Sequence, residues 1–286
     1  MTATQLGFTG MPTRLFTCTP SRLTTWLDCP RRYKFVYVDR PTPPKGAPWA
    51  HNSLGAAVHT SLAAWWDRPV ADRTPERAAA LVREKWIDLG FRDDEQSAQW
   101  RERAETMVSN YVAQLDPHRE PIGIERTVAM RTERLALSGR IDRLDRRGDE
   151  LVVVDYKTGR HVLTTDDARS SMALAVYALA AARTLRTRCV SVELHHLPSG
   201  DVIRWEHSEA SLARHLGRAE DIASEASSAQ MTAAESESHD ALFPPRPGPM
   251  CGWCDFAAHC PEGRAAAAPR ASWAGLAEEL EPLSEI

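Results

Sequence analysis

Long apolar runs are missing from this 286-residue sequence. None reaches the roughly 18–20 residues that a helix needs to cross a bilayer, and the start of the chain lacks the charged and then apolar layout of a secretory signal. We therefore expect a cytoplasmic protein with no membrane partner. Hydrophobic residues make up 43% of the chain and charged residues 26%, an ordinary globular composition, and the length suffices for one large domain or two small ones.

Lysine is scarce: only positions 34, 45, 85 and 157 are lysines, and the other 31 of the 35 basic residues are arginines. Lys157 is therefore notable, because this chain uses arginine at most positions that need only a cation. The net charge of −4 argues against a uniformly basic nucleic-acid binder. However, residues 1–40 carry six basic and two acidic residues, whereas residues 205–240 carry two basic and eight acidic ones. A local basic surface of this kind is compatible with DNA contact.

Hydrophobic periodicity predicts a helical block followed by an α/β sheet. The expected helices lie at about 21–28, 52–66, 75–89, 95–115, 166–186 and 208–229. The expected strands lie at 122–130, 134–147, 150–159, 189–197 and 201–207. The helix between the third and fourth strands would then be a crossover on one face of the sheet. The last helix is expected to decay into a polar linker within residues 224–240.

Two charged residues end the otherwise apolar segment VVVDYKTG, residues 152–159. Asp155 and Lys157 lie on one face of the predicted strand because side chains alternate. Asp142 lies in the preceding strand, the expected hairpin partner, so the two carboxylates can come within a few ångströms. They would repel each other unless a cation lay between them, and Mg²⁺ or Mn²⁺ prefers oxygen ligands.

With Lys157 holding a phosphate oxygen or the attacking water, these residues suit metal-assisted phosphodiester hydrolysis. The alternative is a surface hairpin with an Asp–Lys ion pair. His59, in the helical segment LGAAVHTSL, is a second candidate. A lone histidine on an apolar helix face is usually a core residue, so His59 becomes a candidate ligand only if its helix packs over the sheet end that carries Asp142.

The spacing of the last three cysteines indicates a metal site. Cys251, Cys254 and Cys260 fall within ten residues, and Cys29 is the obvious donor of a fourth ligand. Zinc fits four thiolates, and so does a [4Fe–4S] cluster. We expect little else to hold the tail beyond about residue 240. A disulfide framework is not expected in a cytoplasmic chain. Two further cysteines are expected to be plain buried thiols: Cys18 and Cys189.

Five segments, in this order, resemble the RecB-like nucleases of the PD-(D/E)XK superfamily: SRLTTWLDCPRRYKF, LGAAVHTSL, GRIDRLD, VVVDYKTG and CGWCDFAAHCP. More closely, they resemble the branch with an iron–sulfur cluster, which includes the CRISPR-associated adaptation exonucleases and the nuclease domain of the AddB helicase–nuclease subunit. The resemblance implies a restriction-endonuclease-like α/β fold with a mixed sheet core. It implies one domain, 1–286, with four parts: an N-terminal segment (1–50), a helical block (51–118), the core sheet (119–207) and a C-terminal helix with a cysteine-rich tail (208–286).

The same resemblance implies roles for individual residues. His59, Asp142 and Asp155 would bind the catalytic Mg²⁺ or Mn²⁺, with the backbone carbonyl of Tyr156 as a further ligand. Lys157 would act with the two aspartates by orienting water and stabilising charge on the phosphoryl oxygens. The four cysteines would hold a structural [4Fe–4S] cluster: Cys29, Cys251, Cys254 and Cys260.

The implied activity is that of a metal-dependent DNA exonuclease in repair, recombination or CRISPR adaptation. Its implied partners are single-stranded DNA or duplex ends, and helicase or CRISPR adaptation proteins. Tyr177 is an expected DNA contact, as are Arg31 and Arg32, which belong to the basic stretch that flanks Cys29; the alternative for the two arginines is a solvated helix face. The family often has a glutamine four residues before this tyrosine, where this chain has Ala173. Two alternatives stay open: a non-catalytic DNA-end-binding or scaffold subunit with a cluster, and a zinc-binding interaction module.

Overall fold

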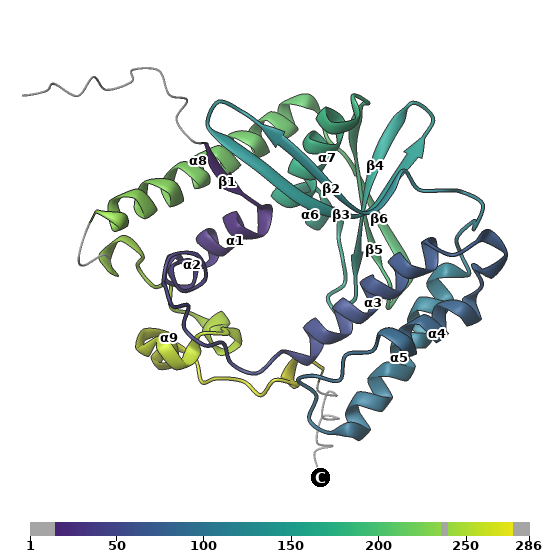
Figure 1. Cartoon of the computed structure of the whole chain (residues 1–286), viewed down its shortest axis with the longest axis horizontal. Helices are drawn as coiled ribbons and strands as arrows, with labels where there is room; N and C mark the ends of the chain where they lie inside the picture. Colours follow the sequence, from purple (N-terminus) through teal and green to yellow (C-terminus); the bar gives the residue numbers. More distant parts are fainter. Residues whose placement is uncertain (1–14, 236–239, 277–286) are drawn as a thin grey trace, which may run out of the picture.

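The computed structural model describes residues 15–235 and 240–276, and its centre is a six-stranded mixed sheet (Figure 1). The strands are β1 (Phe16–Cys18), β2 (Gly123–Arg131), β3 (Leu135–Arg147), β4 (Glu150–Lys157), β5 (Cys189–His196) and β6 (Asp201–Glu206). Their order is β1-β3-β4-β5-β6, and β2 also pairs with β3. The β1–β3 and β4–β5 pairs are parallel and the others antiparallel. The mixed α/β fold and the five expected strands are thus confirmed.

The strand that organises the sheet is β3. Along one edge, β2 pairs with β3 from Ala136 to Leu144. The other edge is shared, because β1 pairs with β3 only up to Leu137 and β4 pairs with it only from Arg143 onward. A strand has two edges, so residues 138–142 lack a strand partner on the shared edge within the described part of the chain. The sheet therefore has an opening between β1 and β4.

Four helices cover one face of the sheet. They are α1 (Pro20–Asp28), α6 (Thr165–Ser170), α7 (Met172–Leu185) and α8 (Glu209–Ala234). Leu151 and Val153 of β4 point to this face and are fully buried. The helix expected at 166–186 is split, because Ser171 ends α6 and its hydroxyl accepts a hydrogen bond from the Leu174 amide at the start of α7. Together, α7 and α8 complete the larger of two cores.

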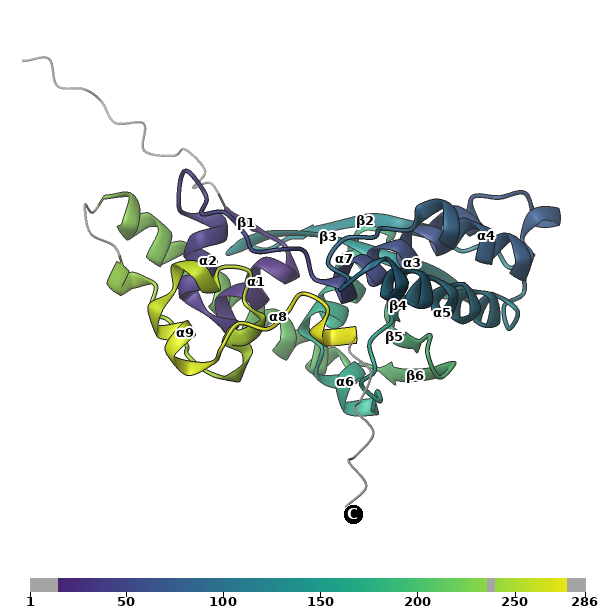
Figure 2. The same cartoon turned by 90° about the horizontal axis from the view of Figure 1, so that it is seen from below.

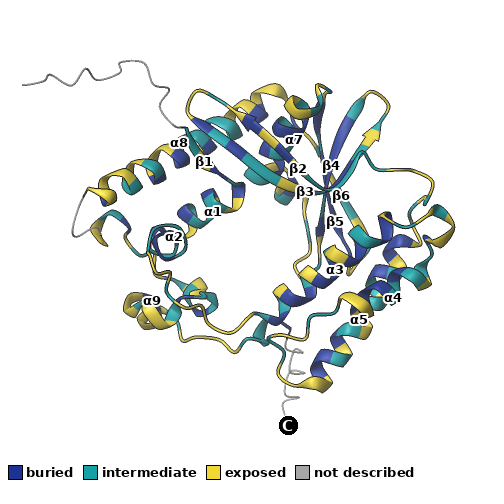
Figure 3. Ribbon diagram, in the orientation of Figure 1, coloured by how far each residue is buried: buried dark blue, intermediate teal, exposed yellow. Residues whose placement is uncertain are grey.

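Three helices cover the opposite face: α3 (Ala50–Trp66), α4 (Pro75–Lys85) and α5 (Asp94–Val112). They correspond to the expected helical block. Val152, Val154 and Tyr156 alternate with the residues of the first face and pack into this second core around Trp65. Figure 3 shows buried residues on both faces of the sheet and exposed ones on the outer sides of the helices. The strand β4 is thus buried from both sides until it reaches its last residues.

The C-terminal tail runs back to the N-terminal helices and to α3 (Figure 2). Its short elements are η2 (Asp240–Leu242), η3 (Pro249–Trp253), η4 (Ala257–His259), α9 (Pro261–Ala266) and η5 (Ala274–Leu276). Phe243 is fully buried in the larger core, and Phe256 packs on Phe35 with ring centroids 5.4 Å apart. Trp49 Nε1 donates a hydrogen bond of 2.8 Å to Asp255 Oδ1. The expectation that little besides the cysteines holds the tail was therefore wrong.

Two helical segments differ from the sequence prediction. The helix α2 (Pro30–Tyr37) follows Cys29 directly, where no helix was predicted. In addition, α8 continues to Ala234, five residues beyond the predicted end at about residue 229, and residues 236–239 of the predicted linker lie outside the described residues. One further short element, η1 (Val70–Asp72), joins α3 to α4. Among the described helices, none combines the length and the hydropathy that a bilayer span requires.

Candidate active site

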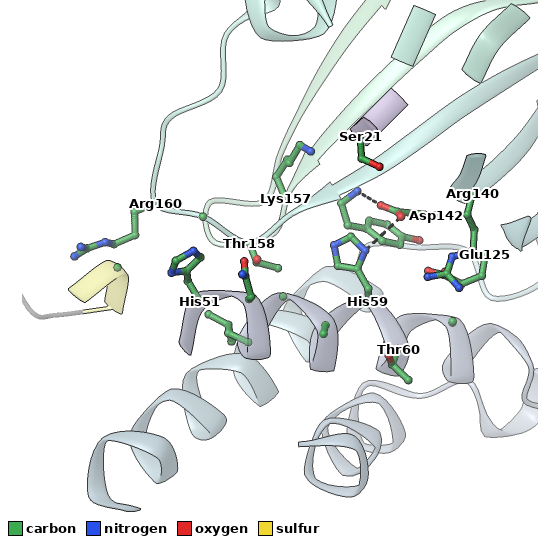
Figure 4. Close-up of a pocket in the computed structure, with 18 of the residues that line it drawn as sticks. Ser21, His51, His59, Thr60, Glu125, Arg140, Asp142, Lys157, Thr158 and Arg160 are labelled. Carbon is green, nitrogen blue, oxygen red and sulfur yellow. Dashed lines mark hydrogen bonds and ion pairs between the residues drawn. The ribbon is translucent and has the colours of Figure 1, made fainter. Parts of the chain in front are cut away.

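A cleft of about 900 Å³ lies between α3 and the opening in the sheet (Figure 4). The start of α1, the strands β2, β3 and β4, the helix α7 and η5 complete its walls. Five of the residues named from the sequence line this cleft: His59, Asp142, Tyr156, Lys157 and Tyr177. A sixth, Asp155, contacts Lys157. His59 and Tyr177, which are 118 positions apart in the chain, thus line the same cleft. The sequence analysis named both residues but could not show that they lie together.

Asp142 is held at the point where β3 and β4 separate. The last paired residues of the two strands here are Arg143 and Val154, so Asp142 and Asp155 come one step beyond the ladder. The Tyr156 amide donates a hydrogen bond of 2.8 Å to Asp142 Oδ2, so a side-chain oxygen takes the place of a strand carbonyl. This fixes the carboxylate, whose second oxygen, Oδ1, lies 3.3 Å from His59 Nδ1.

His59 reaches the carboxylate from α3, as the helix position required. At Gly55, one turn earlier on the same face, an added Cβ would lie 3.5 Å from Thr158 Oγ1, so α3 packs closely on the end of β4. Burial lowers the pKa of His59, but the hydrogen bond to Asp142 and the nearby charges of Asp142, Asp155 and Glu125 outweigh it and raise the pKa above its usual value. His59 is therefore partnered with an acid rather than with apolar core residues.

Asp155 and Lys157 form an ion pair, with 2.7 Å between Asp155 Oδ2 and Lys157 Nζ. Burial raises the pKa of Asp155; Lys157 opposes this, while the Asp142 charge adds to it, and the pKa stays above its usual value. The Lys157 side chain is 45% exposed and lines the cleft. The Asp–Lys pair expected of a plain surface hairpin is thus present, but it lies beside Asp142.

Glu125 of β2 is the residue that the sequence analysis missed. One ligand atom from each of His59, Glu125 and Asp142 lies within 4.8 Å of the others. Glu125 has a φ of 46°, a left-handed conformation that is uncommon for a glutamate, and it pairs with Arg140 at 2.7 Å. Burial raises its pKa, Arg140 opposes this, and Asp142 adds to the rise. Nothing in the pattern IGIERTVAM distinguishes this residue from an ordinary alternating strand position.

The donor set fits a hard divalent cation. An imidazole nitrogen and carboxylate oxygens are ligands that Mg²⁺ and Mn²⁺ accept, and soft sulfur ligands are absent from this group. Tyr177 borders the same cleft from α7, where burial and the charges of Asp155 and Asp142 raise its pKa. Its ring packs directly on Gly139, where an added Cβ would lie 2.3 Å from Tyr177 Cε1.

The four cysteines expected to bind a metal line a second cavity, of about 230 Å³. Cys29 comes from the junction of α1 and α2, and the other three come from the tail: Cys251, Cys254 and Cys260. The Gly263 amide donates a hydrogen bond of 3.3 Å to Cys260 Sγ. No disulfide joins cysteines in the described residues. Cys18 and Cys189 are buried elsewhere, and burial raises the pKa of Cys18 to about 11 and that of Cys189 to about 12.

The arginines expected to contact DNA lie beside this cysteine cavity. Arg31 Nε donates a hydrogen bond of 3.0 Å to the Phe243 carbonyl, and its Nη1 lies 3.6 Å from Asp240 Oδ2. The structure thus gives Arg31 contacts within the chain, between α2 and the tail. Arg32 lines the cavity, and its Nε is buried without a hydrogen-bond partner among the described residues. Contact of either residue with DNA stays a prediction.

Residues 17–261 match the family described as the PD-(D/E)XK nuclease superfamily. Among solved structures, the chain is similar to a “Putative exonuclease” from Eubacterium rectale, with 8% sequence identity, 93% of each chain covered and a TM-score of 0.50. It is also similar to a protein named SSO0001, with 12% identity, 88% of this chain and 89% of that chain covered, and a TM-score of 0.38. No curated protein matches the sequence. Because the family match spans most of its length, the chain belongs to the PD-(D/E)XK nuclease superfamily.

Proposed function

We propose that this nuclease is a Mg²⁺- or Mn²⁺-dependent deoxyribonuclease of the RecB-like branch that degrades DNA from its ends. The observation that carries the proposal is the placement of Asp142, which is fixed by the Tyr156 amide and flanked by His59 and by the Asp155–Lys157 pair. These residues lie together beside the unpaired stretch on the shared edge of β3, residues 138–142.

The proposed metal ligands are His59, Asp142 and Asp155, with the Tyr156 carbonyl as a further donor. The ligand atoms that cluster within 4.8 Å are those of His59, Asp142 and Glu125, so Glu125 is added to the set. Asp155 lies outside that cluster and pairs with Lys157. A divalent cation held there would polarise the scissile phosphoryl group and make a bound water more acidic. The amide bond to Oδ2 restricts Asp142 to one orientation, so its Oδ1 stays directed toward His59. Such preorganisation avoids reorganisation during the reaction.

In this proposal Lys157 acts on the substrate. Its ammonium group is partly exposed in the cleft and is kept beside Asp155 by their ion pair, so it does not swing freely into solvent. From there it can donate hydrogen bonds to a non-bridging phosphoryl oxygen and stabilise the negative charge that develops on it. It can also orient the attacking water through the same donors.

The test is cleavage of end-labelled linear DNA, single-stranded and duplex, with Mg²⁺, Mn²⁺ or EDTA. Lys157→Ala should lower the rate about 10²–10³-fold, the loss typical when one donor to a developing anion is removed. The matched control is Lys85→Ala, an exposed lysine at the end of α4 that does not line the cleft. Metal-dependent cleavage that survives Lys157→Ala unchanged would contradict the assignment.

Circular single-stranded DNA of the same length separates two modes of cleavage. An enzyme that works from ends should degrade the linear form and leave the circle intact. Rapid cutting of the circle would assign an endonuclease instead and would leave the metal and lysine assignments standing.

We also propose that Cys29, Cys251, Cys254 and Cys260 hold a [4Fe–4S] cluster. The four line one cavity, as a shared cofactor requires. The cysteines do not form a compact group of ligand atoms: among the described residues, only His59, Glu125 and Asp142 bring three such atoms within 4.8 Å of one another. Four thiolates also suit a single zinc ion, so the proposal of a cluster rests on the family resemblance and on the shared cavity.

Iron and zinc analysis, with absorbance near 400 nm, tests this proposal. Cys254→Ser should lose the iron, whereas the control Cys189→Ala, which removes a thiol from β5, should keep it. A protein that contains one zinc and no iron after anaerobic purification would overturn the cluster. A structural cluster also predicts equal cleavage rates for oxidised and reduced protein at the same folded fraction.

A non-catalytic DNA-end-binding or scaffold subunit is the second candidate. The observation that favours it is Ala173, which stands where the family often has a substrate-positioning glutamine and which lines a cavity beside α6 and α8 rather than the cleft. Tight binding of DNA ends without cleavage in either metal would select this candidate.

We further propose that 1–286 acts as one domain, because the sheet contributes to both cores. We also propose that it serves repair, recombination or CRISPR adaptation together with helicase or adaptation proteins.

A further inference from the structure

A second groove adjoins the cleft. It has a volume of about 770 Å³ and lies between α5 and the turn that joins β5 to β6. Trp100, Thr158 and Arg160 line both hollows. Figure 4 shows Thr158 and Arg160 on the segment that leaves β4 just after Lys157. The groove therefore opens into the cleft immediately beside the proposed catalytic lysine.

One wall of the groove is a row of exposed polar side chains on α5. The row consists of Gln99, Arg103, Thr106, Asn110 and, just beyond the helix, Gln114. Spacings of three and four residues place them on one helix face. From Gln99 to Asn110 the helix rises about 16 Å, which is long enough to follow a few nucleotides of an extended strand. The Arg103 guanidinium stacks on the Trp100 ring at 4.9 Å, near the junction with the cleft.

The opposite wall is short and supplies further hydrogen-bonding groups. It is formed by residues 197–200 of the β5–β6 turn together with Thr158 and Arg160. The Ser199 hydroxyl there already donates to Asp201 Oδ2, so the groups this wall offers are the Thr158 hydroxyl and the Arg160 guanidinium. The lining thus combines two arginines with neutral amides and hydroxyls, and Glu102 is its one carboxylate. Arginine suits phosphate oxygens, and neutral donors and acceptors suit the edges of unpaired bases. A site for duplex backbones alone would be more densely positive.

We propose that this groove binds the single-stranded part of the nucleic-acid substrate and leads it past Arg103 and Arg160 to Lys157. The inference rests on the proposed function, because it names the substrate form that the cleft receives. Phosphates contact the two arginines, and the bases face the amide side chains of α5. The groove thereby favours single strands or frayed ends over intact duplex, as polar channels for single strands do.

The first experiment measures binding of a fluorescent 20-nucleotide oligothymidylate in EDTA, which prevents cleavage, against a blunt hairpin duplex. Arg103→Glu should weaken oligothymidylate binding at least tenfold and reduce the salt slope by about 0.7, the value for one phosphate contact of a single strand. The matched control is Arg101→Glu, on the same helix but outside the groove, which should bind within twofold of wild type. Asn110→Asp, which adds a charge without removing the Trp100 stack, should weaken binding as well.

The second experiment separates this inference from the proposed function. Hydrolysis of bis(p-nitrophenyl) phosphate with Mn²⁺ reports on the cleft without a polynucleotide. Arg103→Glu should lower the ratio of oligonucleotide to ester hydrolysis at least tenfold. Unchanged binding in both groove variants, or tighter binding of duplex than of single strand by wild type, would overturn the groove. A protein that hydrolyses neither substrate yet shows Arg103-dependent binding of single strands would retain the groove and lose the proposed nuclease activity.

Discussion

The Tyr177 ring packs directly on Gly139. Whether Gly139→Ala raises or lowers the free energy of unfolding should therefore depend on whether residue 177 is a tyrosine. In Gly139→Ala, the added Cβ would lie 2.3 Å from Tyr177 Cε1, whereas ordinary contacts of a Cβ begin near 3.4 Å. The tyrosine ring must therefore retreat by about 1 Å. Because the ring borders the cleft near Asp155, this retreat also disturbs the proposed active site.

The magnitude follows from two opposing effects. Glycine in a strand interior is less favourable than alanine by about 0.5–1 kcal/mol, so the substitution without a clash would stabilise the fold. Overpacking typically costs about 1–3 kcal/mol. We therefore expect Gly139→Ala to lower the free energy of unfolding by up to about 2 kcal/mol in the wild-type background. In a Tyr177→Ala background the ring that the added Cβ would meet is absent, so Gly139→Ala should raise the free energy of unfolding by about 0.5–1 kcal/mol.

Urea denaturation of the four proteins of this cycle, in EDTA, measures both values and their difference. Gly217→Ala, on α8 with no atom within 4 Å of the added Cβ, is the control and should act equally in both backgrounds. If Gly139→Ala destabilises the protein to the same extent with and without the tyrosine ring, the contact with Tyr177 is not the cause and the reasoning fails.

Three further predictions concern the two candidate sites. Asp142→Asn keeps an acceptor for the Tyr156 amide and removes a charge beside Asp155, so unfolding in EDTA at pH 8.5, where the pairing of Asp142 with His59 contributes least, should show equal or higher stability while metal-dependent cleavage is lost. Because the pKa of His59 is raised in the folded protein, its stabilising contribution is present below about pH 6.5 and is lost as the pH rises through the folded-state pKa. Denaturation in EDTA should therefore show His59→Gln less stable than wild type at pH 5.5, with a smaller difference in the free energy of unfolding at pH 8.5. An added Cβ at Gly263 would lie 3.3 Å from Cys260 Sγ, so Gly263→Ala should lower the bound iron measured per protein, and full iron content would contradict this.

The sequence predicted the parts of the fold and site that depend on local pattern. Alternating apolar residues marked the strands, and the run DYK placed Asp155 and Lys157 on one side of β4. The meeting of His59 with Asp142 was only conditional, because it depends on how α3 packs over the sheet. The position of Glu125 near His59 and Asp142 could not be predicted, since Glu125 has a left-handed backbone angle that no residue pattern specifies.

The two helical errors have a similar origin in tertiary structure. Pro30 was interpreted as the end of a helix, but proline is equally suited to the first position of the next one, and α2 begins there. Among otherwise polar residues, the end of α8 buries only small side chains in the larger core: Ala226, Ala229 and Ala233. Polar contacts with α1 add to this weak apolar stripe. Gln230 accepts a hydrogen bond from Arg22, and Glu225 accepts one from the Trp26 indole. Single-sequence periodicity does not register such polar contacts.

Because the Tyr156 amide donates its hydrogen bond to the Asp142 carboxylate, exchange of this one amide proton reports on the candidate active site. In a regular ladder, exchange of an amide proton with solvent reports local opening of the strands. At Tyr156 it reports instead whether a single side chain stays in place. Movement of Asp142 would expose this amide while the neighbouring pair of Arg143 and Val154 remains closed. Hydrogen exchange at one backbone position thus follows the occupancy and motion of the cleft in the unmodified protein.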